Sequence, residues 1–383
     1  MSIKRIIVGN YKSIEHLDLQ LNPLAVFVGP NNAGKSNILD CFLFLSDFVK
    51  TGADAAKKRG GFEQIVFNGD LARKISIELQ GSIQIKTKER LYRYFIEFEG
   101  DRWGNCHNKQ EIFSHKRGKG EQKLLEFPSE DNMAIAWDET GKRTGGIGAG
   151  RDKSYLYHFS DQVRYPILGH FSNEVQNWGS FNLLPPLMRS PLPVRKDFQL
   201  QPWGENLSVV LHGLQTEHPG KFKEIEDILK SAIPELEELS TGLTSHEQGQ
   251  TYIRIKEKDL KTIIPSWGIS DGSLHLLGYL APLYLPTPPP LVCFEEPENY
   301  VHPRLLELIV DLLKSSSETT QLLVSTHSPY LVDFLKPQDL IIVEKKGGRT
   351  QIKRIEDKKG IKEALKTLGL GELWYSGSLG GVP

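Results

Sequence analysis

The segment FVGPNNAGKSN at residues 27–37 constrains the fold more than any other part of the chain. An apolar run that predicts a buried strand leads into it, and residues 36–49 follow with the apolar spacing of a helix. Between them, Gly29 is followed after four residues by glycine, Lys35 and Ser36, which is the Walker A pattern. In such a loop, backbone N–H groups surround the phosphates of ATP or GTP, the lysine reaches the outer phosphates and the serine binds Mg²⁺. An ordinary strand-to-helix turn needs neither lysine nor serine at these positions.

Length and composition limit the class of protein. A chain of 383 residues with 39% hydrophobic and 25% charged residues predicts a globular protein of one large or two modest domains. No apolar stretch approaches the length of a membrane span, and the N-terminus lacks the apolar core of a signal peptide. We therefore expect a cytoplasmic protein without a membrane partner. Cys41, Cys106 and Cys293 have neither disulfide nor zinc spacing, which argues against redox or zinc chemistry.

The charge balance gives no overall basic field. The formal net charge is −1 and the pI is about 6.8, so contact with nucleic acid would require local basic patches. Candidate patches lie at residues 57–61, 86–95 and 114–123. The second interleaves tyrosines with arginines, which suits base stacking with phosphate contact but equally suits an amphipathic strand. Solvated loops and strand faces are the favoured interpretation of all three.

The middle of the chain carries weaker patterns. Alternating residues predict one hairpin at residues 1–20 and another at residues 73–99, which would form a β-rich flap. Glycine, proline and short polar clusters over residues 100–200 predict loops and short strands. Helical spacing then returns and is broken at Pro219 and Pro234.

Three elements of the last third place polar groups where ligands bind. A Ser-Asp-Gly-Ser turn at residues 270–273 opens an apolar helix, whose N-terminus favours an anion. The apolar run before Glu295 and Glu296 predicts a buried strand that ends in two carboxylates, and a second buried strand ends just before His327. Open α/β sheets bind ligands at the carboxyl ends of their strands.

In this order, the four elements resemble the ABC-type ATPases of the SMC and RecF kind. The resemblance is strongest to the small AAA-labelled, OLD-like ATPases of prokaryotic defence systems that lack a Toprim domain, and it covers roughly residues 1–75 and 205–375. It implies an α/β fold: a P-loop NTPase core of ABC type with a mixed sheet, a β-rich flap and an inserted lid or helical region. We expect the first part of the core at residues 1–100, an irregular lid at 101–205, and the helical region with the rest of the core at 206–383.

The resemblance also implies cofactors and residue roles. ATP and Mg²⁺ are the expected cofactors. Lys35 would act in catalysis as well as binding, Glu296 would orient or deprotonate the attacking water, and His327 would contact the γ-phosphate or that water. Mg²⁺ would be held by Ser36, through its hydration shell by Glu295, and by Gln64 as a candidate Q-loop residue. The expected nucleotide-binding residues are Gly29, Pro30, Asn31, Asn32, Ala33, Gly34, Lys35, Ser36, Asn37, Ser270 and Gly272.

The strand-end pair departs from the family pattern. Walker B strands usually end in Asp-Glu, whereas this one ends in Glu295-Glu296, so the carboxylate on the metal side is one methylene longer. Glutamate still reaches a water bound to Mg²⁺, and slow hydrolysis is expected.

The signature turn implies association between chains, because Ser270 and Gly272 would contact a γ-phosphate held by another subunit. A homodimer or a larger oligomer is therefore expected. The favoured hypothesis is an ATP-switched engine that senses DNA, RNA or a phage component and controls a separately encoded effector, such as a nuclease or Toprim-like protein.

Two alternatives remain. One is the nucleotide-binding subunit of an ABC transporter, against which the Ser-Asp-Gly-Ser turn and the long insertion before it argue. The other is the ATPase subunit of a nuclease complex. Only about fifty residues follow His327, so a nuclease would be another polypeptide.

Overall fold

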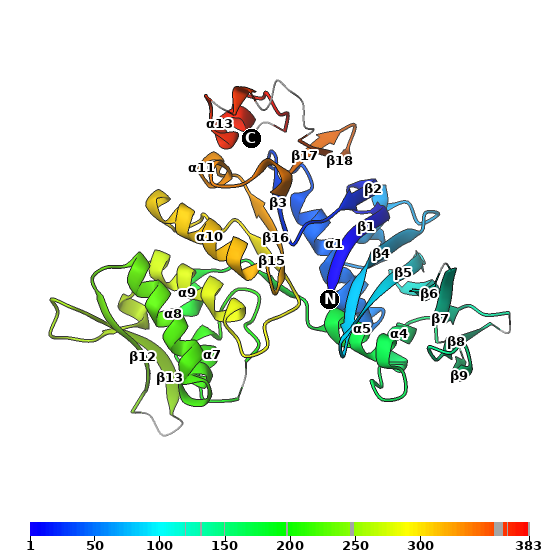
Figure 1. Ribbon diagram of the computed structural model, residues 1–383, viewed down its shortest axis with the longest axis horizontal. Helices are drawn as coiled ribbons and strands as arrows, with labels where there is room; N and C mark the ends of the chain where they lie inside the picture. Colours follow the sequence, from blue (N-terminus) through cyan, green and yellow to red (C-terminus); the bar gives the residue numbers. More distant parts are fainter. Residues whose placement is uncertain are drawn as a thin grey trace. The chain divides into compact units, whose positions relative to one another are not determined.

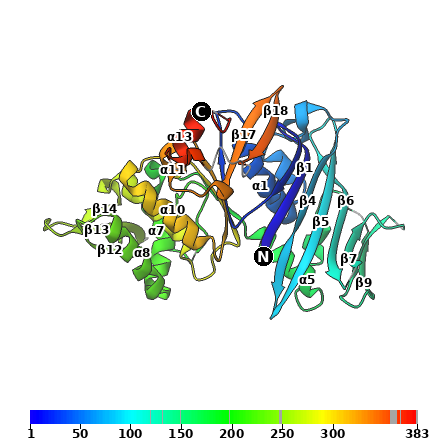
Figure 2. The same ribbon diagram turned by 45° about the horizontal axis from the view of Figure 1, so that its top comes forward.

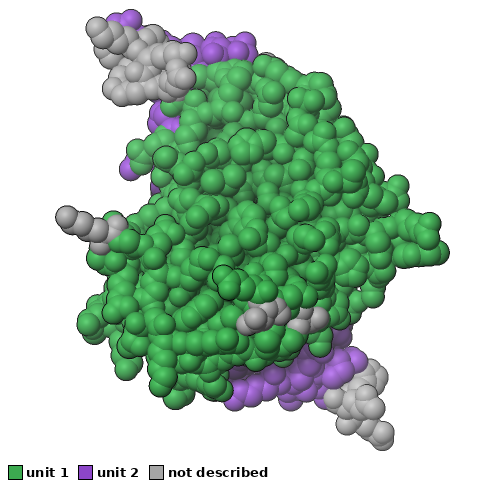
Figure 3. Space-filling model, turned by 90° about the vertical axis from the view of Figure 1, so that its right-hand side faces the viewer, with its two compact units in different colours: residues 1–178, 338–356, 379–383 green, residues 179–337, 357–378 purple. Residues whose placement is uncertain are grey.

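The computed structural model describes residues 1–118, 120–130, 132–148, 150–196, 198–245, 249–355, 363–365 and 367–381. The chain divides into two compact units (Figures 1 and 3). Unit 1 comprises the described parts of residues 1–178, 338–356 and 379–383, and unit 2 those of residues 179–337 and 357–378.

A large antiparallel sheet dominates unit 1, and its long strands lie side by side in Figure 2. Its eight strands follow the order β2-β1-β4-β5-β6-β7-β8-β9. Their bounds are β1 Ser2–Tyr11, β2 Ile14–Gln20, β4 Ile75–Ile85, β5 Lys88–Gly100, β6 Cys106–Arg117, β7 Gly120–Phe127, β8 Met133–Trp137 and β9 Arg143–Gly148. The β1–β2 and β4–β5 pairs confirm both predicted hairpins.

The strands β6–β9 correct the expectation of an irregular lid from residue 101. The sequence pattern there is obscured because β6 points polar residues into the core. Glu111 is fully buried and accepts hydrogen bonds from Tyr94 Oη at 2.9 Å, Asn108 Nδ2 at 2.6 Å and Ser154 Oγ at 2.8 Å. A buried carboxylate breaks the apolar alternation of a strand, yet it is tolerated where donors satisfy it.

Helices cover the inner face of this sheet. Helix α1, Lys35–Thr51, packs Phe44 and Phe48 against Phe98 of β5, at ring distances of 5.1 and 4.7 Å. The other helices of at least four residues in this unit are α2 Asp54–Lys57, α3 Phe62–Ile65, α4 Tyr155–His158 and α5 Pro166–Gln176.

A second set of strands in unit 1 joins the two ends of the chain. Strand β3, Leu24–Val28, pairs in parallel with β17, Leu340–Lys346, which pairs antiparallel with β18, Arg349–Arg354. β3 is fully buried, as its continuous apolar run predicts. The parallel and antiparallel pairs together confirm the expected mixed sheet.

Unit 2 contains a parallel ladder in which β15, Leu291–Glu295, lies between β10, Gly179–Phe181, and β16, Gln321–Thr326. Helices associated with it are α9 Asp271–Leu283, α10 Leu306–Ser316, α11 Pro329–Asp333 and α13 Leu370–Tyr375. Among the described residues of the whole chain, no helix has both the length and the apolar character needed to cross a bilayer.

The rest of unit 2 packs helices on a small antiparallel sheet (Figure 1). Its helices are α6 Pro185–Met188, α7 Leu207–Glu217 and α8 Pro219–Ala232, and its strands are β11 Leu192–Pro193, β12 Leu236–Leu243, β13 Gln250–Glu257 and β14 Ile264–Pro265. The break at Pro219 is confirmed because it opens α8, where proline's missing N–H costs nothing. After Pro234 the chain enters β12 rather than a helix.

Candidate nucleotide-binding and catalytic sites

The Walker A loop of unit 1 has a backbone that only glycine fits at two positions. Gly29 has φ +155°, and a Cβ on it would lie 2.1 Å from the carbonyl oxygen of Val343. Gly34 has φ +106°, and a Cβ there would lie 2.0 Å from Thr350 Oγ1. Both glycines thus allow the loop to lie directly against β17 and β18.

Lys35 opens helix α1 and folds back over the loop. Its Nζ donates to the carbonyl oxygens of Gly29 at 2.8 Å and Pro30 at 3.1 Å, and the residue is only 6% exposed. Asn32 and Ser36, by contrast, are exposed at the surface of the loop. The first N–H groups of α1 and the positive end of its dipole favour an anion at this place.

A chain of hydroxyl groups supports the loop from behind. Thr350 Oγ1 donates to the carbonyl oxygen of Ala33 at 3.0 Å and lies 2.7 Å from Ser13 Oγ, which accepts from Asn37 Nδ2 at 2.6 Å. Sequence analysis missed Ser13 and Thr350, because neither belongs to a motif and they are far apart in the chain. Thr350 lies on β18, which pairs with β17 beside the loop.

Gln64, the candidate Q-loop residue, lies on the wall of a polar pocket of about 490 Å³ beside the Walker A helix. Asn37, Lys12 and Lys345 line the same pocket. Gln64 is therefore near the loop within unit 1, and its role at a metal stays a prediction.

In unit 2, two predicted catalytic side chains meet at the ends of β15 and β16. His327 Nε2 lies 3.7 Å from Glu296 Oε1, and Asn299 Nδ2 donates to Glu296 Oε2 at 2.8 Å. Glu296 has φ +48°, an uncommon conformation for glutamate that its backbone N–H helps to hold by donating to the carbonyl oxygen of Ser325 at 2.8 Å. Such strained positions cluster at functional sites. Glu295, the predicted metal-side carboxylate, is the last residue of β15.

The predicted signature turn caps helix α9. Ser270 Oγ accepts from the N–H of Ser273 at 3.2 Å, and a Cβ on Gly272 would lie 2.8 Å from the carbonyl oxygen of Tyr300. His275, one turn along α9, packs its ring 5.3 Å from that of Tyr300. Burial lowers the pKa of His275 to about 4, so the imidazole is neutral near pH 7. The turn is thus packed against the segment that follows Glu296.

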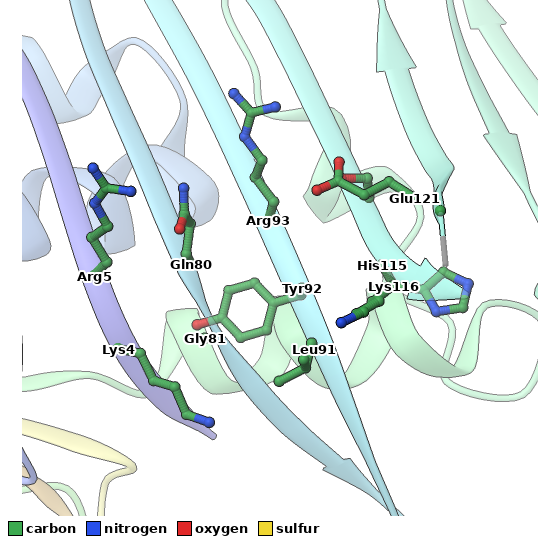
Figure 4. A pocket seen from close by; sticks show the side chains of 12 residues that line it. Lys4, Arg5, Gln80, Gly81, Leu91, Tyr92, Arg93, His115, Lys116 and Glu121 are labelled. Atoms are coloured by element: carbon green, nitrogen blue, oxygen red, sulfur yellow. The ribbon is translucent and has the colours of Figure 1, made fainter. Parts of the chain in front are cut away.

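Two arginines of the basic segment at residues 86–95, Arg90 and Arg93, are paired with carboxylates. A pocket of about 460 Å³ lies on the large sheet (Figure 4). Arg5 of β1 and Arg93 of β5, the strands on either side of β4, both line it. Arg5 pairs with Asp18, and Arg93 pairs with Glu78 at 2.8 Å. Tyr92 and Tyr94 of the same segment are buried. In the segment at residues 57–61, Arg59 is partly buried and pairs with Asp40 and Asp47. The amphipathic-strand interpretation of residues 86–95 is therefore favoured over base stacking.

Comparisons with known proteins bear on the family and the fold of the chain. The family model described as "AAA domain, putative AbiEii toxin, Type IV TA system" matches residues 24–333. The chain is 24% identical over 379 residues to an OLD nuclease of Thermus scotoductus, and the match covers 90% of this chain and 62% of that protein. It is 36% identical over 92 residues to the DNA replication and repair protein RecF of Corynebacterium jeikeium, covering 21% of this chain and 22% of RecF. The chain thus spans less than two thirds of the length of either relative.

A crystal structure of an SMC head bound to the C-terminal winged-helix domain of ScpA has a similar fold. The match has a TM-score of 0.55 at 16% identity and covers 94% of this chain and all of that one. Since the family model covers most of the chain and the fold is that of an SMC head, the chain belongs to this AAA-domain family, as an SMC/RecF/OLD-like protein with an ABC-type ATPase fold.

Proposed function

We propose that the chain binds ATP with Mg²⁺ and hydrolyses it. The observation that carries this proposal is the position of Lys35, whose buried ammonium is fixed by two loop carbonyls at the start of α1. Gly29 and Gly34 let the loop lie directly against β17 and β18, and the backbone N–H groups of a Walker A loop are the groups that surround a phosphate.

The residues also fit Mg²⁺, which prefers oxygen ligands and keeps several waters. Ser36 would supply its exposed hydroxyl, and Glu295, at the end of β15, would accept the hydration shell of the ion. When bound, the ion neutralises charge on the phosphates. Glu296 would orient the attacking water and take its proton. His327, whose Nε2 lies 3.7 Å from Glu296 Oε1, would hydrogen-bond that water or the γ-phosphate.

Glu296→Gln tests the proposed chemistry. It keeps the shape of the side chain and removes the base, so turnover falls about a hundredfold or more while ATP binding is retained. Phosphate release and calorimetric ATP titration measure the two effects. Glu307→Gln, on the exposed side of α10, makes the same change away from the site and serves as the control. Parental turnover in Glu296→Gln would refute the assignment of Glu296.

We also propose that ATP joins two copies of the chain, and that this cytoplasmic switch regulates a process directed at nucleic acid or at a separate effector. The names of the relatives, an OLD nuclease and a RecF replication and repair protein, support anti-phage defence or DNA repair. A gene for a small nuclease or Toprim-like protein beside this one would support the defence role. A permease gene in that place would instead favour a transporter.

An ATPase subunit of a nuclease complex is the second candidate. It is favoured by the match to the OLD nuclease, of which this chain spans only 62%. Co-purification of a nuclease with the tagged chain, and cleavage of DNA by that complex but not by the chain alone, would distinguish it.

A further inference from the structure

A glutamate outside the predicted catalytic set joins the two loops that carry Glu296 and His327. Glu298 Oε1 accepts hydrogen bonds from Thr326 Oγ1 at 2.7 Å and from the backbone N–H of His327 at 2.9 Å. Thr326, the last residue of β16, is fully buried. One carboxylate oxygen therefore fixes both the end of the strand and the first residue of the loop after it.

The residues next to Glu298 connect its hydrogen bonds to the two predicted catalytic side chains. Asn299, the next residue, holds one oxygen of Glu296, whose other oxygen lies 3.7 Å from His327 Nε2. The separation between Glu296 and His327 thus depends on how closely the loop after β15 is held to the loop after β16. Glu298 makes the side-chain hydrogen bonds that hold them.

We propose that Glu298 is a positioning residue that sets the imidazole of His327 at its working distance from Glu296. The inference rests on the proposed function, since that function assigns hydrolysis to Glu296 and His327. Glu298 itself touches neither reacting atoms nor phosphate in this account. Its effect passes through the backbone of His327 and the hydroxyl of Thr326.

The two carboxylate oxygens of Glu298 differ in their contacts, which indicates whether hydrogen-bond acceptance or charge is needed at this position. Oε2 is buried and has no hydrogen-bond partner among the described residues, and burial raises the pKa of this carboxyl. Both contacts use Oε1 alone. The two contacts thus call for an acceptor at the Oε1 position, and the amide oxygen of glutamine is expected to serve there in place of the carboxylate.

The test compares Glu298→Ala with Glu298→Gln in the full chain. Glu298→Ala is expected to lower kcat about a hundredfold, because small misplacements of catalytic groups cost that much, while KM for ATP changes less than about twofold. Glu298→Gln is expected to keep kcat within about threefold of the parent. Glu307→Ala, at an exposed position in the same unit, controls for the loss of a carboxylate.

Histidine-selective NMR supplies a readout independent of ATP turnover. The imidazole signal of His327, assigned from the spectrum of His327→Gln, is expected to move in Glu298→Ala and to return in Glu298→Gln. If the parent protein does not hydrolyse ATP, this pattern still supports the positioning role, and only the proposed function fails.

Two results would overturn the inference. One is an unmoved His327 signal in Glu298→Ala with parental kcat, and the other is an equal loss of kcat in both variants with the signal unmoved. Should Glu298→Ala not fold, Thr326→Val removes one of the two donors and leaves the His327 amide contact. It is expected to move the His327 signal, and an unmoved signal there would also count against the inference.

Discussion

At the scale of single residues, the partly buried carboxylate of Asp40 anchors the Walker A helix. Its carboxylate accepts from Tyr11 Oη at 2.6 Å, from Arg59 Nε at 2.9 Å and lies 2.5 Å from Lys12 Nζ. Burial alone would raise the pKa of Asp40, but the hydrogen bond and charge of Arg59 and the charge of Lys12 outweigh it, so the pKa lies below its usual value.

The lowered pKa of Asp40 gives a pH-dependent prediction. In the unfolded chain the carboxyl titrates near about 3.9, so its stabilising effect is complete above that pH and is lost as pH falls through the folded pKa. Asp40→Asn should lower the free energy of unfolding by about 2 kcal/mol at pH 7, and by less below pH about 4. Urea unfolding of the parent protein and of Asp40→Asn, followed by tryptophan fluorescence at pH 7 and below pH about 4, measures the change in the free energy of unfolding. An equal loss at both pH values would contradict this, and Asp54→Asn, with an exposed carboxylate, is the control.

Residues that follow a pattern were predictable, and those that act through distant contacts were not. The spacing of Gly29, Lys35 and Ser36 is a property of residues close together in the chain, so the sequence alone predicts a Walker A loop between a buried strand and a helix, and the structure has β3 and α1 at those places. Thr350 and Glu298 act by touching residues that other parts of the chain bring to them. Such contacts leave no local trace in a single sequence.

At the scale of elements, strands were predictable where apolar and polar residues alternate and were missed where polar residues are buried. The hairpin β4–β5 alternates cleanly, and its position was anticipated. Strand β6 buries Asn108, Glu111 and His115, so its sequence lacks the apolar alternation and its region was expected to be irregular. The core accepts these side chains in part because Glu111 is surrounded by donors from β5, β6 and α4.

The contact of β18 with the phosphate loop gives a prediction for an element. Thr350 is 2% exposed, and Thr350→Val keeps its shape while removing the hydroxyl that donates to Ala33. A buried acceptor left without its donor costs about 1–3 kcal/mol, part of which falls on the loop proposed to bind nucleotide. ATP affinity should therefore drop about fivefold to tenfold. Calorimetric titration of Mg-ATP measures it. Thr350→Ser keeps the hydroxyl, so an equal loss in that variant would show that the hydroxyl is not responsible.

At the scale of the whole molecule, the family and the mixed sheet were predictable because four short motifs occur in a fixed order. That order survives long insertions, and the match to the family model extends from residue 24 to 333. Association between chains depends on surfaces of the folded protein, and a sequence pattern supplies only the expectation that the signature turn contacts a second copy.

The signature turn permits a direct test of that expectation. Ser270 is exposed and caps α9, whose first N–H groups favour an anion, although the Walker A loop of the same chain is already proposed as a phosphate site. If Ser270 closes over ATP bound to a second chain, Ser270→Arg places a bulky side chain in that contact. Turnover and ATP-driven association should be lost, while ATP binding is retained. Light scattering of Glu296→Gln, with and without Ser270→Arg, measures association, and Ser231→Arg on the exposed side of α8 is the control.

Crosslinking between chains covers the case in which the protein is already oligomeric without ATP. The native cysteines, Cys41, Cys106 and Cys293, are all buried. Ser270 and Asn32 are exposed, so a crosslinking reagent would reach the cysteines that Ser270→Cys and Asn32→Cys introduce. Mixing chains that carry one replacement each should give an ATP-dependent crosslinked pair, because only contact between different chains can join them. Failure of the mixed chains to crosslink with ATP present would refute the shared site. Ser270 would then act only as the cap of α9, a role its hydrogen bond with the Ser273 amide already fills.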